Sequence, residues 1–285
     1  MSLLAAAGLG VLQGVAELFP FSSLGLLVLV PHLLGIPVPD GARYLPFLVA
    51  LHVGTALALL STLGREWGRL LRGWVQWLGG RHNPAGREAW LVVWATIPAG
   101  LLGLLLRHRL AALFGDPGWA ARFLLVNALV MGTVDRISRR LGPRRDFAHL
   151  PVGRACFVGG CQALALIPGL SRTGLTVAAG VLSGLDYASA ARFSFLLATP
   201  IIFAAGLVEL PQLRHGAVAS GMLPAAAVGG LCALVTAWLS ARYLLQYFVR
   251  HRFGGLAWIS AALGALGLLW GLASSAGGFW ALLPR

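Results

Sequence analysis

Six long apolar stretches constrain the fold of this chain more than any other feature. Each is close to the roughly 20 residues that a helix needs to cross the apolar core of a bilayer. An outer-membrane β-barrel would instead alternate apolar and polar residues with a period of two. We therefore predict an all-α integral membrane protein with spans at 44–63, 89–106, 119–137, 189–209, 217–240 and 254–273.

The composition excludes soluble and nucleic-acid-binding classes. Only 11% of the 285 residues are charged, less than half of the roughly 25% that is usual in soluble domains. The formal net charge of +13 comes from 22 arginines against nine acidic residues, with no lysine. In so apolar a chain, arginine-rich loops on the cytoplasmic side of a membrane explain this excess, and we expect no nucleic-acid partner.

Two further apolar regions are interrupted by short polar breaks. The region 2–35 is broken at 19–23, and the region 153–185 is broken at 168–174. Proline and glycine end a helix, and serine or threonine caps the backbone groups that are freed. Such a break is tolerated in a bilayer only against protein or a water-filled cavity. We interpret each region as a re-entrant helical hairpin, with a kinked full span as the alternative.

The two broken regions resemble each other in sequence. When the chain is shifted by 149 residues without gaps, 14 of the 51 positions in 6–56 are identical, whereas about five are expected by chance. Gln13 then matches Gln162, and Ser22 matches Ser171. We therefore predict a single membrane domain, 1–285, made of two repeat halves at 1–150 and 151–285, each with one hairpin plus three transmembrane helices.

An odd number of spans in the first half places the second half upside down in the membrane. Many transporters use such an inverted repeat, with the site at the midplane where broken helices meet. Fourteen arginines fall in 64–88, 136–154 and 242–252, against six on the other side. The positive-inside rule places those three loops in the cytoplasm. Both termini then face outward, and the predicted site opens to the outer face.

The first break carries an acid at a depth where acids are rare. Gln13 and Glu17 are four residues apart and share one helix face. An intramembrane carboxylate is costly and indicates a functional site by default. The alternative is a structural partner for Arg172. Of the two serines that follow, Ser23 is the better candidate nucleophile and Ser22 the better helix cap.

The second break carries Ser171-Arg172-Thr173-Gly174 immediately before an apolar helix. Hydroxyls, backbone N–H groups and a guanidinium at a helix N-terminus form an anion-binding cradle. The guanidinium fork suits phosphate oxygens. A polar helix cap with a snorkelling arginine is the alternative.

These residues resemble the motifs of a known family, the bacterial undecaprenyl-diphosphate phosphatases of the bacitracin-resistance type. The motif (E/Q)-G-x-x-E-x-x-P-x-S-S-x-G-H is matched over 13–25, and P-G-x-S-R-[ST]-G over 168–174. The resemblance covers nearly the whole chain. It implies an enzyme of the bacterial inner membrane that hydrolyses a C55 polyprenyl diphosphate to the monophosphate for cell-wall synthesis, usually with Mg²⁺ or Ca²⁺. Its partners would be the lipid substrate and membrane lipids, and a homodimer is left open.

We combine the residues and the resemblance into one hypothesis for the site. The predicted catalytic residues are Glu17, Ser23 and Arg172; the predicted substrate-binding residues are Gln13, Ser22, His52, Ser171, Thr173 and Gly174; and Glu17 with Gln13 would hold the divalent cation. A metal-activated water is the alternative nucleophile. A flippase for polyprenyl phosphate, or a small-anion transporter, is the rival function on the same scaffold.

One departure from the family leaves the acid–base group open. The family usually has histidine after S-S-x-G, whereas this chain has Leu26. Glu17, a metal-bound water and His52 are the substitutes. His52 lies in the family-like stretch 51–55, for which polar helix packing is an equally good interpretation.

Overall fold

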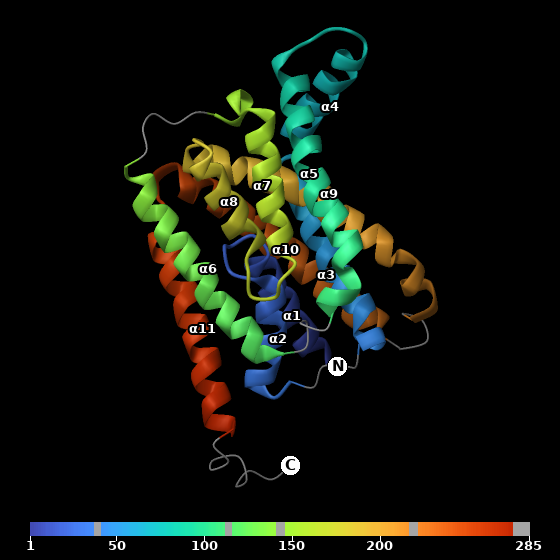
Figure 1. Cartoon of the computed structure of the whole chain (residues 1–285). Helices are drawn as coiled ribbons and strands as arrows, with labels where there is room; N and C mark the ends of the chain where they lie inside the picture. The colour runs from blue at the N-terminus through green and yellow to red at the C-terminus, as the bar shows by residue number, and fades with distance from the viewer. Residues whose placement is uncertain (37–40, 112–115, 141–145, 217–221, 276–285) are drawn as a thin grey trace.

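The computed structural model describes residues 1–36, 41–111, 116–140, 146–216 and 222–275, with backbone alone at 41–46, 106–111, 206–216 and 274–275. Regular structure within these ranges is entirely helical (Figure 1). The helices are α1 (Leu3–Ala16), α2 (Ser23–Leu34), α3 (Gly41–Thr62), α4 (Gly64–Leu78), α5 (Pro84–Ala111), α6 (Pro117–Ser138), a 3-10 turn η1 (Phe147–His149), α7 (Val152–Leu164), α8 (Arg172–Leu182), α9 (Tyr187–Gly216), α10 (Leu223–Arg250) and α11 (Gly254–Ser275).

Five helices, α5, α6, α9, α10 and α11, are long and apolar enough to cross a membrane. They correspond to the predicted spans 89–106, 119–137, 189–209, 217–240 and 254–273, of which 217–221 lies outside the described residues. The sixth predicted span, 44–63, lies in α3, which bends by 76° into α4 and counts as a crossing only if the bent pair is one span. The prediction of a helical multi-pass membrane protein is confirmed.

Two segments that we predicted as loops are wholly or partly helical. Helix α10 continues to Arg250 and takes up most of 242–252. Within 64–88, α4 is an amphipathic helix that packs against α5. The prediction of a loop was wrong because Trp67, Leu70 and Trp74 recur at helical spacing, which places them together against the core.

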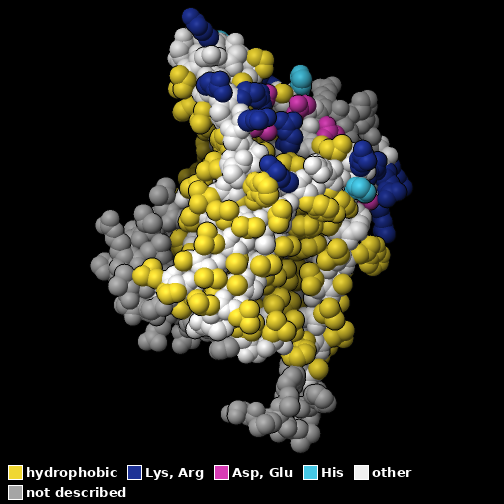
Figure 2. Space-filling model, turned by 180° about the vertical axis from the view of Figure 1, so that it is seen from behind, with side chains coloured by type: hydrophobic (Ala, Val, Ile, Leu, Met, Phe, Trp, Pro, Cys, Tyr) yellow, Lys and Arg dark blue, Asp and Glu magenta, His cyan; other side chains and the backbone are white. Residues whose placement is uncertain are grey.

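The surface has an apolar band with charge gathered at one end. Figure 2 shows hydrophobic side chains over most of the described face, with arginines concentrated at the end where α4 lies. There Arg69 makes a bidentate ion pair with Glu88 of α5, and Arg192 of α9 contacts Glu66 of α4 at 2.7 Å. An apolar belt below a charged rim suits a protein immersed in a bilayer.

Both broken regions form two short helices joined by a turn. Helices α1 and α2 reach the middle of the molecule from one end, and α7 and α8 reach it from the opposite end (Figure 1). Helix α1 packs so closely on α10 that a Cβ at Gly10 would overlap the carbonyl oxygen of Gly229. Gly159 plays the same part for α7, against Ala95 of α5. Small residues at these crossings let the backbones approach.

Candidate active site

The two turns are built in the same way. Ser22 is the N-cap of α2, and its Oγ accepts a hydrogen bond from Gly25 N at 3.1 Å. Ser171 is the N-cap of α8, and its Oγ accepts from Gly174 N, also at 3.1 Å. A serine cap satisfies one of the orphan donors at the start of a helix. The match in sequence between the two breaks is therefore also a match in local geometry.

The turns also contact each other directly. Ser22 Oγ accepts a second hydrogen bond, from the backbone N–H of Gly169 in the other turn, at 3.0 Å. The hydroxyl of Thr173 donates to the backbone carbonyl of Glu17 at 3.3 Å. Gly25 lies against Gly169, where a larger residue would crowd the backbone. Segments about 150 residues apart thus form one polar junction within an apolar core.

Asn127 of α6 holds this junction together. Its Nδ2 donates to the carbonyl of Pro20 at 2.8 Å, and its Oδ1 accepts from Ser171 N at 3.1 Å. The same Nδ2 donates to Ser260 Oγ of α11 at 3.1 Å. Asn127 is completely buried. One side chain therefore satisfies backbone groups from both turns, as buried backbone groups require.

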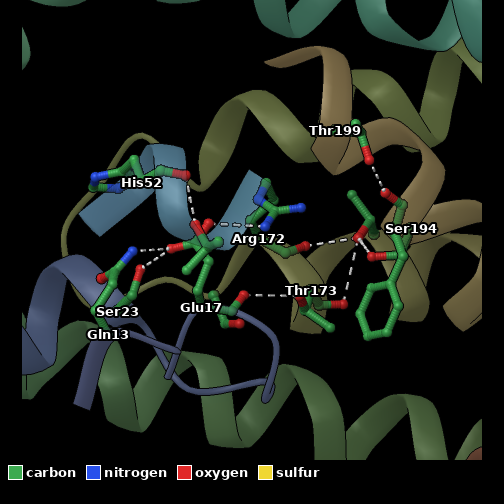
Figure 3. Close-up of polar contacts among 12 residues, drawn as sticks. Gln13, Glu17, Ser23, His52, Arg172, Thr173, Ser194 and Thr199 are labelled. Carbon is green, nitrogen blue, oxygen red and sulfur yellow. Dashed lines mark hydrogen bonds and ion pairs between the residues drawn. The ribbon is translucent and has the colours of Figure 1, made fainter. Parts of the chain in front are cut away.

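Glu17 and Arg172 meet at the centre of the junction (Figure 3). Arg172 Nη2 lies 2.8 Å from Glu17 Oε1, and the two side chains are only 12% and 7% exposed. The second carboxylate oxygen, Oε2, accepts from Ser23 Oγ at 2.5 Å and from Gln13 Nε2 at 3.1 Å. Three predicted residues from the first break therefore converge with the arginine of the second.

A cavity of about 150 Å³ opens beside this cluster. Its polar lining consists of Glu17, Ser22, Ser23, His52, Gln162, Ser171 and Arg172, and its apolar lining includes Ala99, Leu166, Ile201, Ile202 and Ala205. The remaining predicted site residues, Gln13, Thr173 and Gly174, are buried and contact the first turn or Asn127 instead. A cavity with a polar floor and apolar walls suits a ligand that has a charged head group and an apolar chain.

The cluster has unused hydrogen-bonding capacity. Arg172 Nη1 and Gln13 Oε1 are buried, and neither has a partner among the residues that the structure describes. A guanidinium with one nitrogen held by a carboxylate and the other free is preset to bind an anion. The site therefore contains an unpaired cationic hydrogen-bond donor that could bind an anion, and a hydroxyl that is already bonded to a carboxylate.

The geometry bears on the missing histidine in two ways. Leu26 is 4% exposed and belongs to the hydrophobic core. His52 does line the cavity, and its Nδ1 lies 2.8 Å from the carbonyl oxygen of Leu48. Since a carbonyl only accepts, Nδ1 carries a proton. In the neutral ring the other nitrogen, Nε2, is then an acceptor.

The residues suit a divalent cation in their donor type. Mg²⁺ and Ca²⁺ prefer oxygen ligands, and Mg²⁺ is usually bound through one or two carboxylates together with substrate phosphates. Glu17 supplies the carboxylate, and the free Gln13 Oε1 is a second oxygen next to it. In the described part of the chain, no three His, Cys, Asp or Glu side chains lie close enough together to hold a metal ion by themselves. A cation here would need the phosphates to complete its shell.

Two residues of the junction escaped the sequence prediction. Gln162 lines the cavity, and its match to Gln13 in the repeat could have indicated it. Asn127 is one polar residue in an apolar span, and nothing in its neighbouring sequence points to the two turns.

The chain is similar to known proteins over nearly its whole length. Residues 6–266 match the family model described as bacitracin resistance protein BacA. The chain is 45% identical over 273 residues to a Chromobacterium violaceum protein named undecaprenyl-diphosphatase 2, covering 92% of this chain and 96% of that relative. It is 47% identical over 272 residues to undecaprenyl-diphosphatase 2 of Burkholderia thailandensis, covering 95% and 97%. Undecaprenyl-diphosphatase 1 of Burkholderia pseudomallei is 47% identical over 271 residues, covering 94% and 97%.

Proposed function

Because the chain belongs to the BacA family of bacitracin resistance proteins, we propose that it hydrolyses undecaprenyl diphosphate to undecaprenyl phosphate and inorganic phosphate. The names of relatives at 45–47% identity support this reaction. The observation that carries the assignment to a site is the buried Glu17–Arg172 pair: Glu17 binds the arginine through one carboxylate oxygen and the Ser23 hydroxyl through the other, and Arg172 Nη1 has no partner among the described residues.

Ser23 is the proposed nucleophile and Glu17 its base. The Ser23 hydroxyl already donates to Glu17 Oε2, the arrangement that activates a weak nucleophile. As Oγ bonds to the terminal phosphorus, its proton passes to Glu17. The bond from that phosphorus to the bridging oxygen breaks, and undecaprenyl phosphate leaves. Water then cleaves the phosphoserine and releases phosphate. A water attacking in place of Ser23 gives the same products.

Arg172 is the proposed electrostatic element. Catalysis of phosphoryl transfer is mainly positioning and stabilisation of charge on the phosphoryl oxygens. Nη2 is fixed by Glu17, so Nη1 is oriented without loss of side-chain freedom at the moment of reaction. Ser171 adds a hydroxyl on the same side of the cavity.

A divalent cation would be held by Glu17 and Gln13 Oε1 together with the phosphates. It would supply charge neutralisation for the diphosphate. Ser22, Thr173 and Gly174 serve the site by shaping the two turns. Ser22 and Thr173 form hydrogen bonds between the turns, and the Gly174 N–H donates to the Ser171 cap of its own turn.

The architecture that we propose is an inverted repeat with two re-entrant hairpins and an outward-open site. Support comes from the opposite approach of α1–α2 and α7–α8, from the matching serine caps and from the 14 identities in 51 positions. Single cysteines at Ser2 and Gly153, in a variant lacking Cys156, Cys161 and Cys232, test it. We expect labelling of position 2 from outside and of position 153 from the cytoplasm. Labelling of both from one side contradicts the inversion.

Phosphate release from undecaprenyl diphosphate by purified protein in detergent tests the reaction. We expect turnover by the wild-type chain and its loss in Glu17→Gln. If the folded wild-type chain releases no phosphate with Mg²⁺ or Ca²⁺ present, the phosphatase assignment fails and the transporter alternative gains.

A further inference from the structure

Gln162 has a side-chain amide that the fold leaves unused. It lies on the last turn of α7, it is 3% exposed, and it lines the same cavity as Ser23 and Arg172. Neither Oε1 nor Nε2 has a hydrogen-bond partner within the described ranges. Among the polar residues of this cavity lining, both polar side-chain atoms are unpaired in Gln162 alone.

The repeat explains why the amide is free. Gln162 corresponds to Gln13 when the chain is shifted by 149 residues, and Leu166 then corresponds to Glu17. In the first half, Gln13 Nε2 donates to the carboxylate four residues later. In the second half, leucine stands in place of that carboxylate, so Gln162 has no acceptor of its own.

A buried amide without a hydrogen-bond partner is unfavourable for folding. Leu166 itself lines the cavity, so a glutamate there would both occupy Gln162 and place a second negative charge beside the ligand. The chain instead keeps a neutral, unpaired amide in the same cavity lining as Arg172, whose Nη1 is also buried without a partner among the described residues. A ligand with several acceptor oxygens, such as a diphosphate, satisfies both donors at once.

We propose that Gln162 binds the lipid diphosphate, with Nε2 donating to a non-bridging phosphate oxygen next to the one that Arg172 Nη1 binds. The inference rests on the proposed phosphatase function and adds a residue to its substrate-binding set. Gln162 thereby fixes the orientation of the diphosphate relative to Ser23 without adding charge.

The variants Gln162→Leu and Gln162→Glu test this role. For both we expect kcat/KM for phosphate release from undecaprenyl diphosphate to fall roughly 10- to 100-fold, the usual effect of losing a hydrogen bond to a charged group. Gln162→Glu should lose more, because a carboxylate repels the diphosphate. Inhibition by inorganic diphosphate should weaken by a similar factor in both variants.

Stability separates this role from a structural one. Gln162→Leu removes no described protein hydrogen bond, so its thermal unfolding midpoint in detergent should equal or exceed that of the wild type. Gln246→Leu, at an exposed position on α10, is the matched control and should keep wild-type kinetics.

The outcomes distinguish the inference from the function on which it rests. If the wild-type chain releases no phosphate, the proposed function fails. If the wild-type chain is active, Arg172→Ala is inactive, and both Gln162 variants keep kcat/KM within threefold of wild type, the inference alone is overturned. A Gln162→Leu variant that loses activity only in proportion to its loss of folded protein overturns it as well.

Discussion

The turns at 17–23 and 166–172 have the same backbone plan and opposite chemistry. In each, a serine caps a short helix and accepts from a glycine N–H three residues later. The first turn adds Glu17 and Ser23, an acid and a hydroxyl in contact. At the equivalent positions the second has Leu166 and Arg172.

In the mechanism that we propose, this difference divides the reaction between the halves of the chain. The first half supplies the base Glu17 and the nucleophile Ser23, and the second supplies the guanidinium of Arg172 and the amide of Gln162. Neither turn holds a complete set, because Glu17 and Arg172 neutralise each other only when the turns meet. A repeated local structure thus gives a stable frame in which the copies acquire different roles.

The largest expected effect comes from removing the charge of either turn. Arg172→Ala and Glu17→Ala should each lower turnover by at least roughly 10²- to 10³-fold, because each removes a preorganised charge from the reacting centre. Each also leaves a buried charge unpaired, which costs about 3–5 kcal/mol of stability. Phosphate release and thermal unfolding in detergent measure the two effects separately.

The double variant Glu17→Gln/Arg172→Met sharpens that result. It removes both charges, so stability should recover relative to the single variants while activity stays lost. Arg139→Ala is the control, since that arginine is paired with Asp135 but two-thirds exposed, and it should keep turnover. An active double variant would mean that the pair is only structural.

The two serines of the first turn should separate chemistry from capping. Ser23→Ala removes the proposed nucleophile, and we expect turnover to fall by at least about 100-fold, as for loss of other site groups. Ser22→Ala removes a cap and orphans Gly169 N–H, costing about 1–3 kcal/mol of stability. Its activity loss should be smaller. The opposite ranking of activities in folded protein would assign the nucleophile to Ser22.

Breaking the contact between the turns tests whether they act as one unit. Asn127→Leu leaves Pro20 C=O and Ser171 N–H without their partner, and we expect about 2–4 kcal/mol of destabilisation from two buried unsatisfied groups. Thermal unfolding in detergent measures this loss of stability. The unfolding midpoint of Asn83→Leu, which removes a hydrogen bond outside the junction, is the comparison. A wild-type unfolding midpoint for Asn127→Leu would show that the turns are held by other contacts.

The smallest effect is expected at His52. This residue lines the cavity but bonds to its own helix through Nδ1. We expect His52→Gln to keep at least about a tenth of the activity, a loss below ~1.4 kcal/mol in transition-state stabilisation. A loss of more than about 100-fold in turnover by folded His52→Gln would instead make His52 the substitute for the histidine that Leu26 replaces.

Sequence alone determined the long apolar helices, the two breaks and the residues that carry charge at those breaks. These features depend on short-range physics: apolar length sets the spans, and Pro, Gly and Ser set where helices stop and start. The repeat was also visible, because both copies keep the same capping and turn residues. Amphipathic α4 was missed because its arginines outweighed its apolar stripe in the prediction of a loop.

Only the tertiary structure decided which groups meet and which remain unpaired. Glu17 and Arg172 are 155 residues apart, and Asn127 joins the turns from a third helix. The sequence shows that Gln13 has Glu17 four residues later and that Gln162 has Leu166 there. Only the packing shows that no distant residue in the described ranges supplies Gln162 with another partner. The charges of the site were therefore fixed by the chain's local motifs, and its binding capacity by the packing of its two halves.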